Sequence, residues 1–361
     1  MKTKNNVPAY ARLSRRLRHR GLAGLTNYMI ERNFFSVGQA LFCREKVNNR
    51  TVMYDCGGQT EAIIKNVIDA EYPARNTEVI DALFISHYDK DHINGVFHLL
   101  NRCRVNHLFL PMVSSLSRML SFYGWQYTSQ MRQFYADPKS YIQQTYGGTQ
   151  VHYVEQSERV VQTNEPVDIE RFNGRDIPNV SLIRFRDNPD WVYIPFNRKL
   201  MTTQEETQFL GALGLPANAS FADILTKWRR QRLSFKAIVG RLGIIDIRKI
   251  NDYSMTLYSG SISQRNACLF LGDYNAHSYF ADLQNAYRPL WGNIRVIQVP
   301  HHGSIHNYHC GLCQQGTEYV VSNKPAPYTK TQVNPDLIIR HIKTIAGQPC
   351  YTTFGGDVVL H

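Results

Sequence analysis

Potential metal ligands follow directly after three largely apolar runs, and this coincidence limits the fold more than any other feature of the chain. The run at residues 82–86 leads into a six-residue loop with four ligand side chains. The runs at 267–271 and 296–299 are followed by an aspartate and by two adjacent histidines. A metal ion would satisfy several such buried polar groups at once. The seven side chains are His87, Asp89, Asp91, His92, Asp273, His301 and His302.

The order of the expected elements is typical of an α/β protein. Alternating patterns predict a hairpin over residues 33–54, and Thr60 is expected to cap a helix that runs to Ile68. A buried strand at 82–86 and a helix at 93–100 follow. In open α/β sheets, ligands bind at the carboxyl ends of strands. Side chains from separate strands are therefore expected to converge on one edge.

Histidine and carboxylate ligands together suit zinc, manganese or iron. A metal with an open coordination position lowers the pKa of a bound water and supports hydrolysis. We therefore predict one or two divalent ions, Zn²⁺ or Mn²⁺, and a metal-dependent hydrolase. The simpler alternative, a polar loop at a strand end, does not explain the ligands at the other two strand ends. Ser86 and Ser304 lack the context of a serine nucleophile.

The run His87-x-Asp89-x-Asp91-His92, followed by Ile-Asn-Gly, resembles the metallo-β-lactamase superfamily. Asp89 replaces the second histidine of the common form, an exchange typical of the branch similar to the hydrolase domain of the DNA-uptake protein ComEC. Further landmarks follow in order at 37–39, 55–57, 251–254, 271–273, 300–304 and 342–353. The resemblance implies an α/β fold, a four-layered αβ/βα sandwich of two mixed β-sheets flanked by helices.

The same resemblance implies two ions that share one aspartate. The expected ligands of the first ion are His87, Asp89, Asp273 and one histidine of the adjacent pair. The expected ligands of the second ion are Asp91, His92 and the bridging Asp273.

Roles within the histidine pair are also implied by the resemblance. His301 is expected to be the ligand, and His302 to act catalytically on the phosphate or the leaving group. Asp91 is expected to act in catalysis as well as in metal binding. Asp55 is expected to orient the ligands from behind.

One segment departs from the family pattern. Relatives usually complete the second site with a histidine in an Asn-x-Tyr-Gly-His-Pro-like segment, whereas residues 328–335 contain no histidine. Asn334 could supply a weaker carbonyl ligand, or the second ion could be loosely held, exchangeable or absent. Lys330 or Lys324 could instead contact a phosphate.

The net charge of +12 favours an anionic partner, and nucleic acid is the commonest. We expect a basic segment at 1–25, a hydrolase domain at 26–361, and a basic helical insertion within it at about 185–250. A solvated helix face is the alternative reading of the insertion, and a transit peptide that of the basic segment. The expected nucleic-acid contacts are Arg15, Arg16, Arg18, Arg229, Arg230 and Arg232.

Phosphodiester hydrolysis of DNA or RNA is the leading function. A hydrolase of a small phosphodiester, such as a cyclic nucleotide or a lipid head group, would use the same metals. A protein of another class, which binds nucleic acid or a partner and has lost catalysis with its second site, is the third possibility. Hydrolysis of β-lactams or thioesters is disfavoured because it does not explain the basic segments.

Seven cysteines, an odd number, suit reduced thiols and a cytoplasmic location. No apolar run approaches the roughly 20 residues that span a bilayer, so no membrane partner is expected. The segment 306–313 offers two histidines and two cysteines and resembles a compressed zinc site. Ordinary thiols are favoured there, because the adjacent His309 and Cys310 would have to turn toward one ion.

Overall fold

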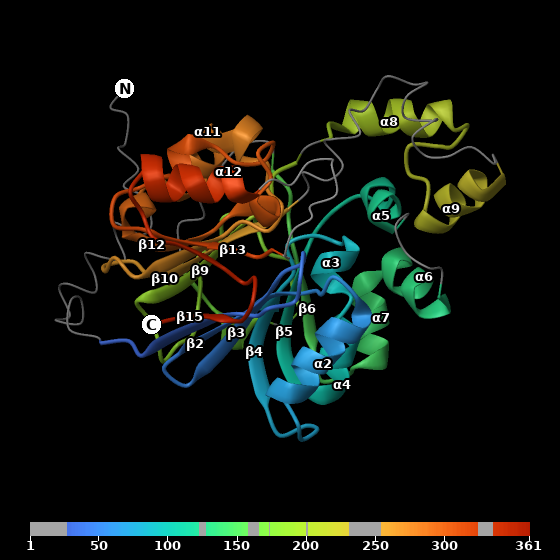
Figure 1. Cartoon of the computed structure of the whole chain (residues 1–361). Coiled ribbons are helices and arrows are strands. Elements are labelled where there is room, and N and C mark those ends of the chain that lie inside the picture. The colour runs from blue at the N-terminus through green and yellow to red at the C-terminus, as the bar shows by residue number, and fades with distance from the viewer. Residues whose placement is uncertain are drawn as a thin grey trace, which may run out of the picture.

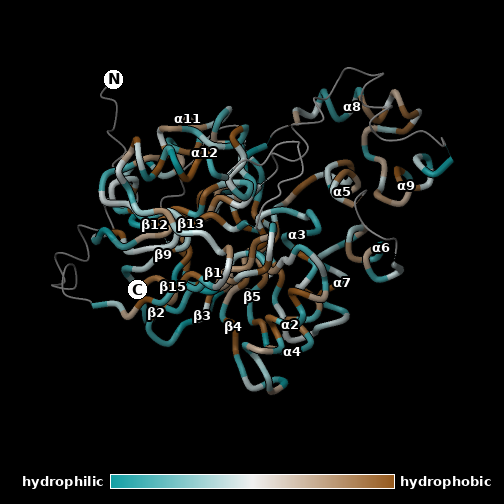
Figure 2. The backbone as a smooth tube through the Cα atoms, in the orientation of Figure 1, coloured by the Kyte–Doolittle hydropathy of each residue, from teal (hydrophilic) through white to brown (hydrophobic). Residues whose placement is uncertain are grey.

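Two β-sheets pack face to face, and helices cover the outer face of each sheet (Figure 1). The computed structural model describes residues 27–122, 128–157, 166–172, 174–199, 201–230, 254–323 and 335–361. One apolar core lies between the sheets, and two others lie between a sheet and its helices. Figure 2 shows this layering as apolar strands inside a more polar surface. The expected αβ/βα sandwich is confirmed.

The first sheet has seven strands in the order β15-β1-β2-β3-β4-β5-β6. Strands β3 to β6 run parallel, and the remaining pairings are antiparallel. The expected hairpin is formed by β2 and β3, which turn at the left-handed Asn48, but its first strand begins at Phe42 rather than Asn33, because Asn33 and Phe34 belong to β1. The strands are β1 (Ile30–Phe34), β2 (Phe42–Val47), β3 (Arg50–Cys56), β4 (Val79–Phe84), β5 (Arg104–Pro111), β6 (Gln150–Val154) and β15 (Val358–Leu360).

The second sheet has eight strands in the order β14-β13-β12-β11-β10-β9-β8-β7. Strands β11 to β14 are parallel, so β11 and β12 end at the same edge. The strands are β7 (Val167–Asp168), β8 (Ile183–Arg184), β9 (Trp191–Phe196), β10 (Thr256–Ser261), β11 (Ala267–Phe270), β12 (Ile294–Gln298), β13 (Glu318–Val321) and β14 (Cys350–Thr352).

The helical insertion expected from about residue 185 is wrong at its start. Strand β9 occupies residues 191–196 and pairs with β10 along its whole length. All six of its residues are buried, because the other sheet covers one face and the helical layer covers the other. A strand buried on both faces is apolar throughout and shows no alternation.

Helices follow only after β9, in α8 (Thr203–Ala212) and α9 (Phe221–Arg230), and residues 231–250 lie outside the described ranges. The capping box of α8 pairs Thr202 with Glu205. At the start of α9, Ser220 and Asp223 exchange hydrogen bonds in the same way.

The remaining helices cover the two sheets. The first sheet is covered mainly by α2 (Glu61–Glu71), α4 (Val96–Arg102), α6 (Ser129–Ala136) and α7 (Pro138–Thr145), and the second by α11 (Ala276–Tyr287) and α12 (Pro335–Arg340). Helix α5 (Ser115–Phe122) lies between α6 and α9, and the short α3 (Lys90–Ile93) follows β4. In the described ranges, no helix is both long and apolar enough to cross a bilayer.

Candidate metal centre

The loops after β4, β11 and β12 bring the seven candidate ligands into one cluster. The loop after β4 contributes His87 and Asp89, and the helix α3 that continues it contributes Asp91 and His92. The backbone N–H of Met255 donates to the carbonyl of Ser86 at 2.7 Å, which ties this loop to the second sheet. The backbone N–H of His301 donates to the carbonyl of Gly272 at 2.9 Å, which joins the other two loops. The convergence expected from the strand pattern is therefore present.

One carboxylate oxygen of Asp273 faces two imidazoles. Its Oδ2 lies 3.8 Å from His87 Nε2 and 3.6 Å from His301 Nε2. Asp89 Oδ2 lies 3.9 Å from the same nitrogen of His87. Two imidazoles and the Asp89 carboxylate thus lie on this side of Asp273.

The other oxygen of Asp273 faces a second set. Its Oδ1 lies 3.2 Å from His92 Nε2 and 3.9 Å from His302 Nε2. Asp91 Oδ2 lies 3.3 Å from His302 Nε2. Asp273 thereby stands between two groups of equal composition, and each group is a donor set that suits Zn²⁺ or Mn²⁺.

The histidines are oriented as metal ligands are. In each of the four, Nδ1 faces an oxygen acceptor, so Nδ1 carries the proton and Nε2 offers its lone pair to the cluster. The acceptors are Ser86 Oγ for His87 at 2.8 Å, Asp55 Oδ2 for His92 at 2.7 Å, Asn307 Oδ1 for His301 at 3.0 Å and the Ser322 carbonyl for His302 at 3.0 Å.

Several of the atoms that face the cluster have no hydrogen bond within the described part of the chain. These buried atoms are Nε2 of His87, His92 and His302, and Oδ1 of Asp273. A buried polar atom without a partner costs about 1–3 kcal/mol. Ligand atoms of His87, His92 and Asp273 lie within 4.8 Å of one another, and so do those of Asp91, His92 and His302. The residues therefore fit a metal ion.

Asp55 lies directly behind this cluster. Its Oδ1 accepts a hydrogen bond from the backbone N–H of Ser86 at 2.7 Å, and its Oδ2 accepts from Ser86 Oγ at 2.7 Å as well as from His92. Through Ser86 it also fixes the oxygen that faces His87. Asp55 has a left-handed backbone with φ 58°, which is uncommon for aspartate. One buried carboxylate thus orients two candidate ligands.

The adjacent histidines have an unusual backbone. His301 and His302 have φ 48° and 54°, and Gly303 continues the left-handed turn at φ 84°. The left-handed conformation costs a residue with a side chain about 1–2 kcal/mol. It lets two consecutive imidazoles approach the two different oxygens of one aspartate. The sequence pattern did not predict this conformation.

The charges of the cluster depend on one another. Burial, together with His92, lowers the pKa of His87 to about 4. Burial opposes ionisation of Asp91, but His92 and His302 outweigh it and bring its pKa to about 2. Burial and the Asp91 charge raise the pKa of Asp89 to about 7. Without a cation, burial and the neighbouring charges favour protonation of Asp89 and ionisation of Asp91. A divalent cation would favour the ionised form of every carboxylate and the neutral form of every imidazole in the cluster.

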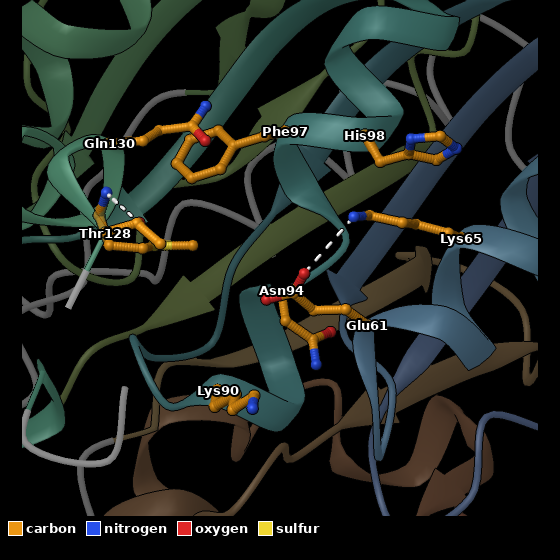
Figure 3. Close-up of a pocket in the computed structure, with 9 residues that line it drawn as sticks. Glu61, Lys65, Lys90, Asn94, Phe97, His98, Thr128 and Gln130 are labelled. Carbon is orange, nitrogen blue, oxygen red and sulfur yellow. Dashed lines mark hydrogen bonds and ion pairs between the residues drawn. The ribbon is translucent and has the colours of Figure 1, made fainter. Parts of the chain in front are cut away.

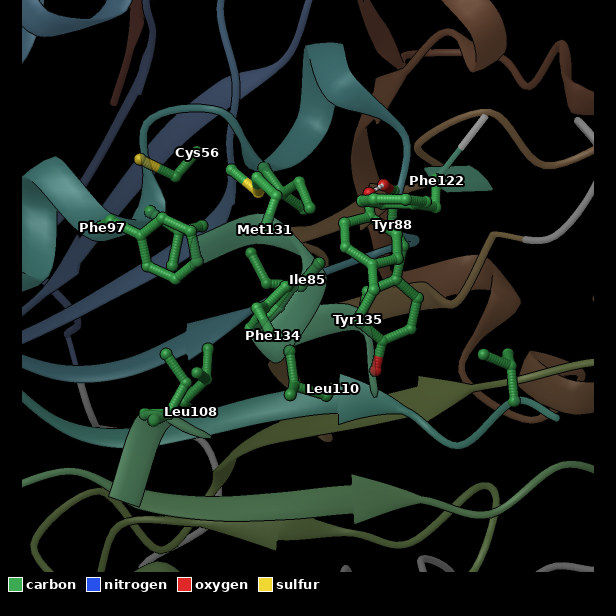
Figure 4. Close-up of a cluster of buried hydrophobic side chains, with 14 of the residues drawn as sticks. Cys56, Ile85, Tyr88, Phe97, Leu108, Leu110, Phe122, Met131, Phe134 and Tyr135 are labelled. Carbon is green, nitrogen blue, oxygen red and sulfur yellow. Dashed lines mark hydrogen bonds between the residues drawn. The ribbon is translucent and has the colours of Figure 1, made fainter. Parts of the chain in front are cut away.

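Tyr88 anchors the ligand loop from the opposite side. Its side chain lies among the aromatic residues of the helical core, beside Tyr135 (Figure 4). Its hydroxyl donates to the Pro111 carbonyl at 3.1 Å, and the Tyr135 hydroxyl donates to the backbone carbonyl of Tyr88. The loop is therefore held both by the core and by α6.

A cavity of about 260 Å³ beside α3 is separate from the cluster (Figure 3). Lys65 and Lys90 line it, and Lys65 Nζ lies 3.4 Å from Glu61. Asn94, at the end of α3, exchanges two hydrogen bonds with the backbone of Gly58. None of the seven candidate ligands is among the described residues that line the cavity.

The zinc-like segment 306–313 forms no metal cluster among the described residues. His309 Nδ1 accepts a hydrogen bond from the backbone N–H of Gly311, and its ring stacks on Phe280. Cys313 faces the Tyr308 hydroxyl at 2.8 Å.

Several predicted site residues lie outside the described ranges. They are Arg15, Arg16, Arg18, Arg232, Lys324, Lys330 and Asn334. Arg229 and Arg230 are exposed in the last turn of α9. Ser86, Asn307 and Ser322 were missed by sequence reasoning, and only the position of Ser86 next to His87 could have suggested a role.

Comparison with known proteins shows distant likeness. No family model matches the chain, and no curated protein matches it by sequence. A crystal structure of the metallo-β-lactamase fold protein YhfI from Bacillus subtilis is similar at 9% identity, with a TM-score of 0.41. The match covers 92% of this chain and 99% of YhfI.

Proposed function

We propose that this protein is a metal-dependent hydrolase with a site for two divalent ions. The observation that carries the proposal is the position of Asp273, whose two carboxylate oxygens each face a different pair of imidazoles. A carboxylate that bridges two ions is the arrangement used for two-metal hydrolysis of phosphate esters. The donor atoms suit Zn²⁺ or Mn²⁺.

Both histidines of the adjacent pair are proposed as ligands. His301 would join His87, Asp89 and Asp273 around one ion. His302 would join Asp91, His92 and Asp273 around the other. His302 is buried, and its free nitrogen faces Asp91 rather than the solvent, which favours a ligand over a leaving-group contact. It would fill the place left by the missing histidine at 328–335.

The reaction proposed is phosphodiester hydrolysis. When bound, the ions would supply an activated water and neutralise charge on the phosphate. The chain's own residues would prepare this site. Asp55 and Ser86 hold His87 and His92 in position, and Asn307 holds His301. Pre-oriented ligands lower the cost of organising the site at each turnover.

Nucleic acid is the substrate we propose, on the basis of where the charge lies. Lys and Arg are almost matched in number by Asp and Glu over the described residues. Nearly all of the net charge of +12 therefore comes from other residues, above all 1–26 and 231–250. Arg229 and Arg230 directly precede the second of these segments. A phosphodiesterase whose chain concentrates its positive charge in such basic segments suits a polyanion better than a small phosphodiester.

The test measures metal content by plasma mass spectrometry together with hydrolysis of bis-p-nitrophenyl phosphate in Mn²⁺ or Zn²⁺. Wild type should bind up to two ions per chain and turn over the ester. Asp273→Ala should lose both ions and several orders of magnitude in rate. Asp336→Ala, which removes an exposed carboxylate of α12, is the control and should behave as wild type. A wild-type chain without metal or turnover in either ion would overturn the proposal.

The substrate is tested separately with single-stranded DNA, RNA and a cyclic nucleotide. Cleavage of a polymer should fall steeply as salt rises, because phosphate contacts release counterions. Preferential turnover of the cyclic nucleotide, with little dependence on salt, would favour the small-phosphodiester alternative. Salt-dependent binding of the polymer without any hydrolysis would favour the third possibility, a protein that binds nucleic acid and has lost catalysis.

A further inference from the structure

We propose that Cys310 and Cys313 form a reversible disulfide that weakens the neighbouring metal centre when it closes. The two cysteines belong to the segment Cys310-Gly311-Leu312-Cys313, which the proposed hydrolysis does not use. The effect on the metal centre rests on the proposed function, whereas formation of the disulfide does not.

The backbone of this segment brings the two cysteines together. Residues 310–312 form a 3₁₀ turn, and the backbone N–H of Cys313 donates to the Cys310 carbonyl at 2.9 Å. Side chains three residues apart on a 3₁₀ helix project in the same direction, and a rise of about 2.0 Å per residue separates their Cα atoms by about 6 Å. Disulfides usually join Cα atoms about 5.5–6 Å apart.

The two thiols differ in their exposure to solvent. This difference is typical of a pair in which the exposed cysteine attacks the oxidant and the other then forms the disulfide with it. All seven cysteines lie in the described ranges, and Cys310 is the exposed one. Cys313 is partly buried and lies 2.8 Å from the Tyr308 hydroxyl. Cys350 packs near Cys313 but is buried on β14, where a solvent oxidant does not reach it. Access therefore directs the first reaction to Cys310.

The oxidant class is a low-molecular-weight disulfide such as glutathione disulfide. The Cys310 thiolate attacks one glutathione sulfur, its S–S bond breaks, and one glutathione thiolate leaves. Cys313 then gives up its proton and attacks Cys310 Sγ, and the second glutathione leaves. Two protein thiols are oxidised, one glutathione disulfide is reduced, and the two protons pass to the released thiolates.

The turn is joined to the metal centre through Asn307. The Asn307 side chain faces His301 Nδ1 at 3.0 Å and donates to the Asp273 carbonyl at 2.9 Å. Tyr308, the next residue, makes the contact with Cys313 that a disulfide would remove. The turn itself packs on Phe280, since a Cβ on Gly311 would lie 2.6 Å from that ring. Closing the disulfide turns Cys313 Sγ away from the Tyr308 hydroxyl and toward Cys310, and the loss of this contact loosens the adjacent Asn307, which orients His301.

The experiment equilibrates the full-length protein in glutathione buffers of graded ratio. Differential alkylation and peptide mass spectrometry map the bridge, and the affinity for Mn²⁺ alone is measured by electron paramagnetic resonance of the free ion. Mn²⁺ is used because thiolates bind it poorly. We expect a single 310–313 bridge, reversed by reduced glutathione. The Kd for Mn²⁺ should rise by roughly 10-fold, the scale of losing a partner of a metal-binding histidine.

Two serine variants serve as controls. Cys310→Ser should form no bridge and keep the reduced-state affinity in every buffer, and Cys350→Ser should still bridge 310 to 313. A bridge from Cys313 to Cys350, a stable glutathione adduct on Cys310, or no oxidation at all would overturn the proposed pair. A 310–313 bridge with unchanged Mn²⁺ affinity would overturn the coupling. A reduced protein that binds neither Mn²⁺ nor Zn²⁺ would instead overturn the proposed function, and the peptide mapping would still show whether the bridge forms.

Discussion

The carboxylate of Asp55 and the imidazole of His92 lie 2.7 Å apart, and neither side chain is exposed to solvent. The same carboxylate binds the backbone and hydroxyl of Ser86, which faces His87. Two of the candidate ligands therefore depend on one residue that is not itself a candidate ligand. A change at Asp55 should therefore weaken metal binding although every candidate ligand is still present, and this can be tested.

We expect Asp55→Asn to lower metal affinity by about 10- to 100-fold, because an amide cannot accept all three hydrogen bonds that the carboxylate accepts. The measurement is the Kd for Zn²⁺ or Mn²⁺, with the melting temperature as a check on folding. Asp69→Asn is a matched control, since Asp69 also pairs with a histidine, His98, at 2.7 Å but on the surface. Equal losses in both variants would contradict the role of Asp55.

Removing either histidine of the adjacent pair should remove one ion rather than both. His301→Ala is expected to keep the ion beside His92 and Asp91, and His302→Ala the ion beside His87 and Asp89. Metal content per chain should fall from about two to about one in each case. His277→Ala, an exposed histidine, is the control. A His302→Ala protein that retained two ions would exclude His302 as a ligand.

A histidine pair on β5 and β6, in which His152 is buried and His107 partly buried, should make the fold sensitive to acid. His107 Nδ1 lies 3.1 Å from His152 Nε2, and burial lowers the pKa of each to about 4. Because the folded-state pKa lies below the unfolded value of about 6.5, the unfolded chain binds more protons as pH falls. Stability is therefore lost between pH 6.5 and 4, by roughly 2 to 3 kcal/mol for His152 at pH 4.5.

The check is the free energy of unfolding of wild type and His152→Phe between pH 7 and 4.5. Phenylalanine can stack on Phe109 and Phe172 as the imidazole does, but it cannot titrate. The variant should show a shallower dependence on pH. The exposed His277→Phe should leave the slope unchanged, and parallel slopes for wild type and His152→Phe would rule out this source of acid sensitivity.

The basic end of α9 should contribute to binding of nucleic acid. We expect Arg229→Ala and Arg230→Ala together to weaken DNA binding, and to reduce the slope of log K against log salt by about one for each phosphate that these arginines neutralise. Arg295→Ala with Arg340→Ala is the control, because these charges lie on the second sheet and its helices. An unchanged slope for the α9 variant would show that these arginines do not contact phosphates and only form a solvated helix face.

The positions of the ligands could be predicted because each follows a recognisable strand, and a parallel sheet brings such strand ends together. Strand β9 could not be predicted in the same way, because the sequence of a strand buried on both faces shows neither helical nor alternating periodicity. Asp55 was predicted as a residue that orients the ligands, and it contacts His92 and Ser86, but the other partners of the ligands were missed. Asn307 and Ser322 act through contacts that only the fold creates, and common polar residues in loops give no signal of such contacts. The sequence could not decide which of the adjacent His301 and His302 is a ligand. The left-handed turn that lets both imidazoles approach Asp273 is not visible in a sequence.

That left-handed turn also has an evolutionary consequence. At residues 301 and 302, the left-handed backbone favours glycine or asparagine, whereas a metal site needs histidine. Glycine or asparagine would relax the turn but remove an imidazole. If the proposed site binds metal, histidine is expected to be kept at both positions only as long as that function is needed. Lineages that have lost the metal should drift to glycine or asparagine at these two positions before their strands change. The pair can therefore serve as a marker that separates active from inactive descendants of this fold.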